Sequence, residues 1–122
     1  MHELAVCQSL IREVERAAAA NRAVAAVRVA VAIGPLSGVD GGSLARAFEI
    51  ARADTVAAQA VLEIETVPVR VGCAACGHES EVPANALVCA RCGNWRVELK
   101  SGDELLLKSV ELELGRDRVD LN

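Results

Sequence analysis

The sequence predicts an α+β fold: a small mixed three-stranded sheet with two helices, plus an inserted four-cysteine module. Two observations predict the helices and the sheet. Apolar residues recur at helical spacing in two stretches, and in several other stretches they alternate with other residues. The third observation is a pair of Cys-x-x-Cys motifs that lies between two of the alternating stretches. At 122 residues the chain can form one domain with a small module attached.

The first helix is predicted at residues 3–20, where apolar side chains recur every three or four residues and Asn21 offers a stop. Residues 27–33 then place valine or isoleucine at every second position. This alternation predicts a strand that ends at Gly34-Pro35.

A second helix is predicted to open at residues 40–43 and to run to about Ala60. Residues 61–71 follow with two short alternating stretches, and Pro68 favours an edge position or a bulge because proline lacks an N–H donor. Alternation over residues 104–114 predicts the last strand.

The two Cys-x-x-Cys pairs are the most informative motif of the chain. A two-residue gap lets both sulfurs of a turn converge on one ion, and the glycine that follows each pair lets the backbone fold back. Two alternatives are a pair of disulfides and a redox-active Cys-x-x-Cys. Disulfides suit a secreted chain, and a redox-active motif needs only one of the two pairs. We therefore expect a zinc-ribbon-like module with a closed, structural Zn²⁺ site at Cys73, Cys76, Cys89 and Cys92.

Domain boundaries follow from the place of this module. We expect a discontinuous α/β domain at residues 1–72 and 101–116, a zinc module at 73–100 and a flexible tail at 117–122.

Charge and hydropathy exclude several classes of function. The net charge is −4, and basic and acidic residues balance within the zinc module, which argues against a nucleic-acid-binding zinc ribbon. The apolar runs are too short to span a membrane, and no basic-then-apolar leader begins the chain. Four cysteines arranged for metal fit a reducing cytoplasm. No constellation of catalytic residues stands out, so we do not expect an enzyme, whereas a zinc-ribbon scaffold stays an alternative.

The N-terminal residues Met1-His2-Glu3 form a second candidate metal site. His2 can be an exposed residue before a helix, and Glu3 an acid that favours the helix N-terminus. A free amine, the adjacent amides and an imidazole can also wrap one divalent ion, and this nitrogen-rich set suits Ni²⁺ or Cu²⁺ better than tetrahedral Zn²⁺. Protonation of His2 would weaken such a site, so nickel affinity is expected to fall as the pH drops through the imidazole range.

Five segments together resemble the HypA/HybF family, whose members are nickel metallochaperones that help to mature [NiFe]-hydrogenases. The resemblance spans about residues 1–114. Its segments are Met1-His2-Glu3-Leu4, Gly34-Pro35-Leu36-Ser37-Gly38-Val39, Ala47-Phe48-Glu49, the two cysteine pairs and Ser101-Gly102-Asp103-Glu104-Leu105.

The resemblance implies that the α/β domain carries a Ni²⁺ site and that the cysteine module carries structural Zn²⁺. The nickel ligands would be the Met1 amine, the His2 side chain and the amides of His2 and Glu3, joined in some members by the carboxylates at Glu3 and Asp40. An Asp at this place is also a typical helix N-cap. This sequence has Gly41-Gly42 where the family commonly has Pro-Glu.

The implied partners are the HypB GTPase and the hydrogenase large subunit, and homodimers also occur in the family. In some organisms the family also supplies urease maturation. From the residues themselves we expect Cys7 to be a buried inert thiol and Trp95 to be a packing lid over the zinc loops. His78 is expected to face solvent or to donate to a sulfur, with a role as a zinc ligand in acid as the alternative.

Overall fold

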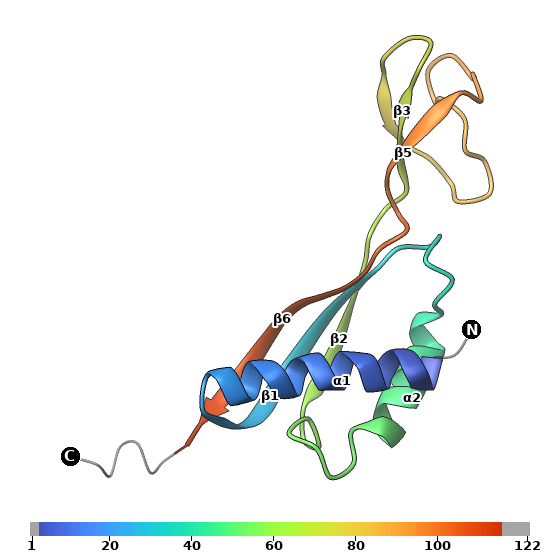
Figure 1. The fold of residues 1–122 in the computed structure, drawn as a ribbon. Coiled ribbons are helices and arrows are strands. Elements are labelled where there is room, and N and C mark those ends of the chain that lie inside the picture. Colours follow the sequence, from blue (N-terminus) through green and yellow to red (C-terminus); the bar gives the residue numbers. More distant parts are fainter. Residues whose placement is uncertain (1–2, 116–122) are drawn as a thin grey trace. The chain divides into compact units, whose positions relative to one another are not determined.

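The computed structural model describes residues 3–115, which form two helices and six strands (Figure 1). The elements are α1 (Glu3–Ala20), β1 (Ala23–Ile33), α2 (Gly41–Ala51), β2 (Val61–Thr66), β3 (Arg70–Cys73), β4 (Glu79–Glu81), β5 (Val97–Ser101) and β6 (Leu105–Leu114). The predicted fold class is confirmed, and strands within the cysteine module add a second three-stranded sheet.

The chain divides into two compact units. The helical unit comprises the chain up to Val31, Asp40–Ile64 and the chain from Leu107 on. The cysteine unit comprises Ala32–Val39 and Glu65–Leu106, a longer stretch than the cysteine motifs alone. The assignment of nickel and zinc functions to separate domains stays a prediction.

The first sheet has the strand order β2-β1-β6 and is mixed. Val67, just after β2, donates its N–H to the carbonyl of Ile33 at the end of β1 at 2.9 Å, so these two strands run in the same direction. Gly34, just after β1, donates to the carbonyl of Glu104 just before β6 at 2.8 Å, so β6 runs the opposite way. On the exposed face, Arg28 of the central strand pairs with Glu63 of β2 and with Glu111 of β6.

The helix α1 occupies the residues predicted for it, and its apolar stripe forms much of the core of the helical unit. The buried residues of α1 are Cys7, Leu10, Ile11, Val14 and Ala18. Asn21 ends the helix as expected, because its side-chain amide donates to the carbonyl of Ala17 at 2.8 Å. Within residues 3–115, neither helix has the length and apolarity that crossing a bilayer requires.

The predicted end of the second helix at about Ala60 is wrong, because α2 ends at Ala51. Asp54 has a positive φ of 63°, and the Thr55 hydroxyl donates to the carbonyl of Arg52 at 2.6 Å. The carbonyl of Val56 accepts a hydrogen bond from the amide of Ala26 on β1. If α2 continued through Val56, this carbonyl would bond within the helix instead. Residues 52–59 therefore form turns, although their composition suits a helix.

Candidate metal centres

The four predicted cysteines come together in one cluster. Their sulfur atoms all lie within 4.8 Å of one another, with Cys73 3.6 Å from Cys92 and Cys76 3.6 Å from Cys89. Four sulfurs at the corners of a tetrahedron lie about 3.8 Å apart when each is about 2.3 Å from a central Zn²⁺. The cluster therefore fits a structural Zn²⁺, and four protein ligands leave no open position for a substrate.

Each Cys-x-x-Cys pair forms the same hydrogen-bonded turn. The sulfur of Cys73 accepts from the amides of Ala75 and Cys76 at 3.3 and 3.4 Å. The sulfur of Cys89 accepts in the same way from the amides two and three residues later, at 3.4 Å each. The glycines that follow, Gly77 and Gly93, both have φ of 76°, a conformation that suits glycine.

The thiols differ in acidity, and the cause is local. Amide donors, above all that of Cys92, lower the pKa of Cys89 to about 6, and the Cys76 amide is the largest cause of a lowered pKa at Cys73. The amide of Asn94 lowers the pKa of Cys92, but the neighbouring sulfurs and burial outweigh it and raise that pKa to about 11. A cation bound among the sulfurs would favour the ionised thiolates, because its charge offsets their mutual repulsion.

The two turns also brace each other within the cysteine unit. Ala74 of the first turn donates its amide to the carbonyl of Arg96 at 2.9 Å. Ala90 of the second turn donates to the hydroxyl of Ser80 on β4 at 3.3 Å, and Ser80 is buried. Sequence reasoning missed Ser80, because a single serine in a short strand carries no pattern and its partner lies ten residues away.

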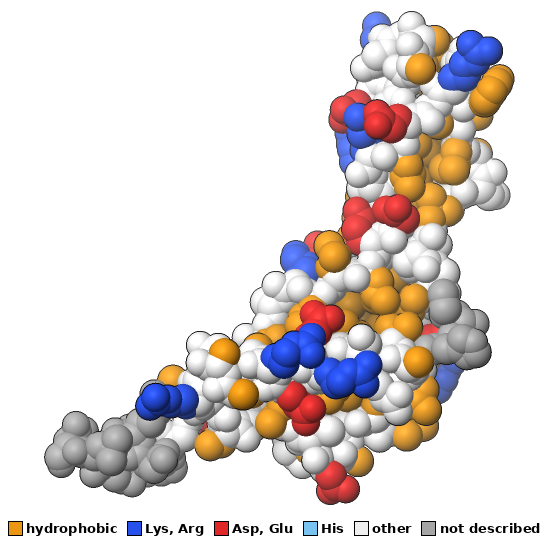
Figure 2. Space-filling model, in the orientation of Figure 1, with side chains coloured by type: hydrophobic (Ala, Val, Ile, Leu, Met, Phe, Trp, Pro, Cys, Tyr) orange, Lys and Arg blue, Asp and Glu red, His pale blue; other side chains and the backbone are white. Residues whose placement is uncertain are grey.

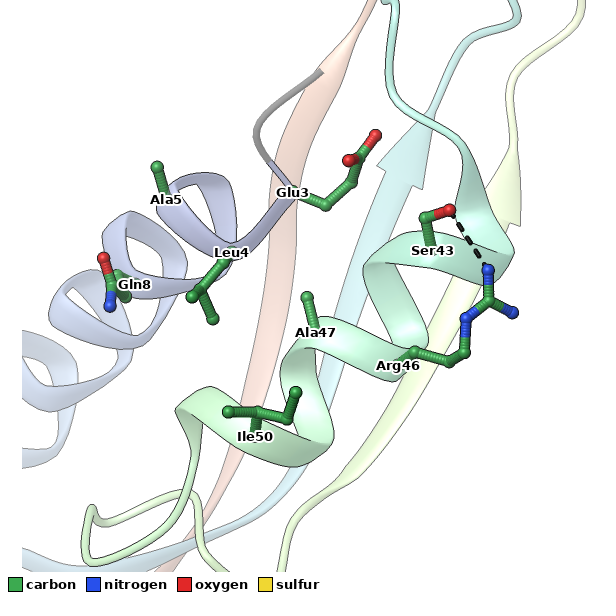
Figure 3. Close-up of a pocket in the computed structure, with 8 residues that line it drawn as sticks. All are labelled: Glu3, Leu4, Ala5, Gln8, Ser43, Arg46, Ala47 and Ile50. Atoms are coloured by element: carbon green, nitrogen blue, oxygen red, sulfur yellow. Dashed lines mark hydrogen bonds between the residues drawn. The ribbon is translucent and has the colours of Figure 1, made fainter.

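Of the predicted nickel ligands, Met1 and His2 lie outside the described residues. Glu3 is the first residue of α1, and it lines a hollow of about 620 Å³ between α1 and α2 (Figure 3). Ser43 and Arg46 from the first turns of α2 lie on the other side of this hollow, joined by a hydrogen bond of 3.2 Å. The hollow is lined by Glu3, Leu4, Ala5, Gln8, Ser43, Arg46, Ala47 and Ile50.

Asp40 is the N-cap of α2, which confirms the first of its two predicted roles, helix capping and nickel binding. Its carboxylate accepts from the amide of Ser43 at 2.8 Å, and this bond is the main reason why the pKa of Asp40 is lowered. The carboxylate is therefore ionised at neutral pH. A role for Asp40 in binding nickel stays a prediction.

Three further predictions concern side chains near these sites. Cys7 is fully buried and donates to the carbonyl of Leu44 at 3.4 Å, and burial raises its pKa to about 11, so the prediction of a buried thiol is confirmed. His78 is half-buried, and no sulfur of residues 3–115 accepts from its imidazole. The prediction of a packing lid is wrong for Trp95, because a side chain that is 72% exposed covers little of the zinc loops.

Four cysteines on two turns of a small sheet, in a chain that also forms a two-helix α/β unit, define a small metal-binding protein. The family described as "Hydrogenase/urease nickel incorporation, metallochaperone, hypA" matches residues 1–112. The chain therefore belongs to the HypA family, which consists of metallochaperones and maturation factors rather than enzymes.

This chain matches relatives from the same family over nearly their full lengths. The chain is 46% identical to hydrogenase maturation factor HypA of Nitrosospira multiformis over 112 residues, which are 92% of this chain and 97% of the relative. It is 39% identical to the HypA of Aquifex aeolicus over 114 residues, or 93% of this chain and 99% of that one. The solution structure of the Ni metallochaperone HypA from Helicobacter pylori is similar, with a TM-score of 0.69 and 34% identity over 94% of this chain and all of that chain.

Proposed function

We propose that this chain binds Ni²⁺ at its N-terminus and delivers the ion during maturation of a [NiFe]-hydrogenase. The observation that carries the proposal is the family match, which begins at residue 1 and so includes Met1-His2-Glu3. An amine, an imidazole and the amides between them form a nitrogen-rich ligand set, which suits Ni²⁺. A carrier must also release its ion, and a cage of four protein sulfurs leaves no open position through which to do so.

The surroundings of Glu3 support this proposal. Glu3 and Ser43 line the same hollow, and the Asp40 carboxylate accepts from the amide of Ser43 at 2.8 Å. Asp40 therefore caps the helix whose Ser43 shares this hollow with Glu3. The cap bond uses one oxygen of Asp40, which leaves the other as an acceptor for a cation.

The cysteine cluster has a different role in the proposal. We assign nickel binding to the domain formed by residues 1–72 and 101–116, and structural zinc to residues 73–100. The HypB GTPase and the hydrogenase large subunit are the partners that the resemblance implies. Zinc would hold the cysteine module rigid for docking to a partner, whereas nickel would be bound and released at the N-terminal site.

Native mass spectrometry of the full chain tests this division. Nickel and zinc are counted after nickel loading in the free-ended protein, in His2→Ala and in a variant extended by a few residues before Met1. We expect both variants to lose nickel and to keep zinc. The matched control is His78→Ala, which removes the other histidine of the chain and should keep both metals.

Asp40 needs a pair of variants because it also caps α2. Asp40→Asn keeps a good cap and removes the charge, whereas Asp40→Ala removes both. Weaker nickel binding in Asp40→Asn, with an unchanged melting temperature, is the result expected of a ligand. Nickel bound among the four sulfurs, or bound equally well by the extended chain, would refute the proposed N-terminal site.

A further inference from the structure

Exposed aromatic, aliphatic and basic side chains occur on the second cysteine turn and on the segment that leads into it. We call this set the tryptophan surface, and its residues are Leu87, Val88, Arg91, Trp95 and Arg96. Trp95 is 72% exposed, and Leu87 and Val88 are 39% and 37% exposed. Figure 2 shows a basic side chain beside hydrophobic ones over this part of the chain, which is orange in Figure 1. Large exposed apolar side chains next to arginines are typical of binding surfaces.

The backbone around Trp95 is held by hydrogen bonds on both sides. Cys89 donates to the carbonyl of Asn94 at 2.9 Å, which closes the second cysteine turn just before Trp95. The amide of Arg96 donates to the side-chain oxygen of Asn94 at 2.7 Å. The turn is further constrained by the metal site, so little order has to be gained when Trp95 binds a partner.

The two arginines of this surface are available for a partner. The guanidinium of Arg96 lies 5.3 Å from the centre of the Trp95 ring, which orients both side chains. Within residues 3–115, neither Arg91 nor Arg96 forms an ion pair with an acid.

We propose that the tryptophan surface docks on an acidic face of a partner protein, with the Trp95 indole entering an apolar cleft. Residues 82–97 carry two arginines and no acid, although the chain as a whole has a net charge of −4. This local contrast favours a partner of opposite charge. A second copy of the chain would bring like charges together in a symmetric contact, and one tryptophan with two arginines is too little to track a nucleic-acid strand.

The inference adds a docking site to the proposed carrier function and can be tested apart from nickel. Trp95 is the only tryptophan of the chain, so 5-fluorotryptophan gives the zinc-loaded protein a single ¹⁹F resonance. The probes are the purified HypB GTPase and the purified hydrogenase large subunit. We expect the resonance to shift with at least one of them, and the affinity to fall with rising salt.

Variants identify the side chains that carry the binding energy, and their affinities are measured by isothermal titration calorimetry, because replacing Trp95 removes the ¹⁹F label. Trp95→Ala and the double variant Arg91→Glu/Arg96→Glu should each weaken binding at least tenfold, as expected for a buried anchor and for reversed charge. Trp95→Phe should keep part of the affinity, and Val24→Ala, at a site 61% exposed in the helical unit, should keep all of it. Zinc content and circular dichroism confirm that each variant is folded.

Several results would overturn the inference. They are binding to neither probe, binding that Trp95→Ala leaves unchanged, a ¹⁹F shift produced only by self-association, and a ¹⁹F shift produced by a single-stranded oligonucleotide. Nickel counting in the same variants keeps the two proposals apart, because His2→Ala should still dock and Trp95→Ala should still bind nickel.

Discussion

Replacing Gly34 by alanine tests the close backbone contact between the end of β1 and the start of β6. A Cβ atom at Gly34 would lie 2.1 Å from the carbonyl carbon and oxygen of Gly102, and 2.7 Å from the nitrogen of Asp103. All three are main-chain atoms, so no side-chain rotation relieves the clash. The two segments would have to separate by about 1 Å or more to reach ordinary contact distance.

Such a separation breaks the hydrogen bonds that hold the contact. Gly34 donates to the carbonyl of Glu104 at 2.8 Å, and Leu36 donates to the carbonyl of Gly102 at 2.7 Å. An unsatisfied buried backbone group costs about 1–3 kcal/mol. With two bonds strained and the clash only partly relieved, we expect Gly34→Ala to lower the free energy of unfolding by about 3 kcal/mol or more.

Urea unfolding of the zinc-loaded protein, followed by far-UV circular dichroism, measures this change. The control is Gly41→Ala, whose added Cβ would lie 3.8 Å from the nearest atom, a methyl group of Ile64. Because Gly41 is helical, this control should be neutral or stabilise by up to about 1 kcal/mol. A Gly34→Ala protein within about 1 kcal/mol of the parent chain would refute the reasoning.

Three further predictions concern single side chains. Gly41→Pro should raise the free energy of unfolding by about 0.4–1 kcal/mol in urea titrations, because position 41 is the first of α2 and needs no N–H donor; a loss would contradict this. The pKa of Cys7 is raised to about 11 from an ordinary 9.0, so its contribution to stability is complete below pH 9 and lost as the pH rises through about 11. Between pH 9 and 11 the melting temperature should fall less steeply with pH for Cys7→Ala than for the parent chain. Equal slopes for the two proteins would contradict the raised pKa of Cys7. Ser80→Ala should speed zinc loss to a chelator about fivefold, because the amide of Ala90 loses its acceptor, and an unchanged rate would show that this bond is dispensable.

The parts that could be predicted from the sequence depend on residues close together in the chain. The helix at Glu3–Ala20 follows from spacing within the helix itself, and the cap at Asp40 from a side chain that reaches an amide three residues on. The cysteine cluster was predictable as well, since each pair is a local turn and a metal needs four ligands.

Contacts between distant segments could not be predicted in this way. The end of α2 depends partly on a bond between Val56 and Ala26, thirty residues apart. The exposure of Trp95 could not be predicted either, because its place just past the second cysteine pair suggested a lid over the zinc loops.

The sequence by itself determined the first helix, the start of the second helix and the two cysteine turns, because periodicity, capping and ligand spacing act over a few residues. Its resemblance to the HypA/HybF family indicated the family of the chain. Only the tertiary structure decided that Gly34 lies against Gly102, that Ser80 braces the second turn and that Trp95 faces outward beside Arg96. The physical reason is that these features arise from the pairing of strands and turns that are far apart in the chain, where many registers satisfy the same local pattern.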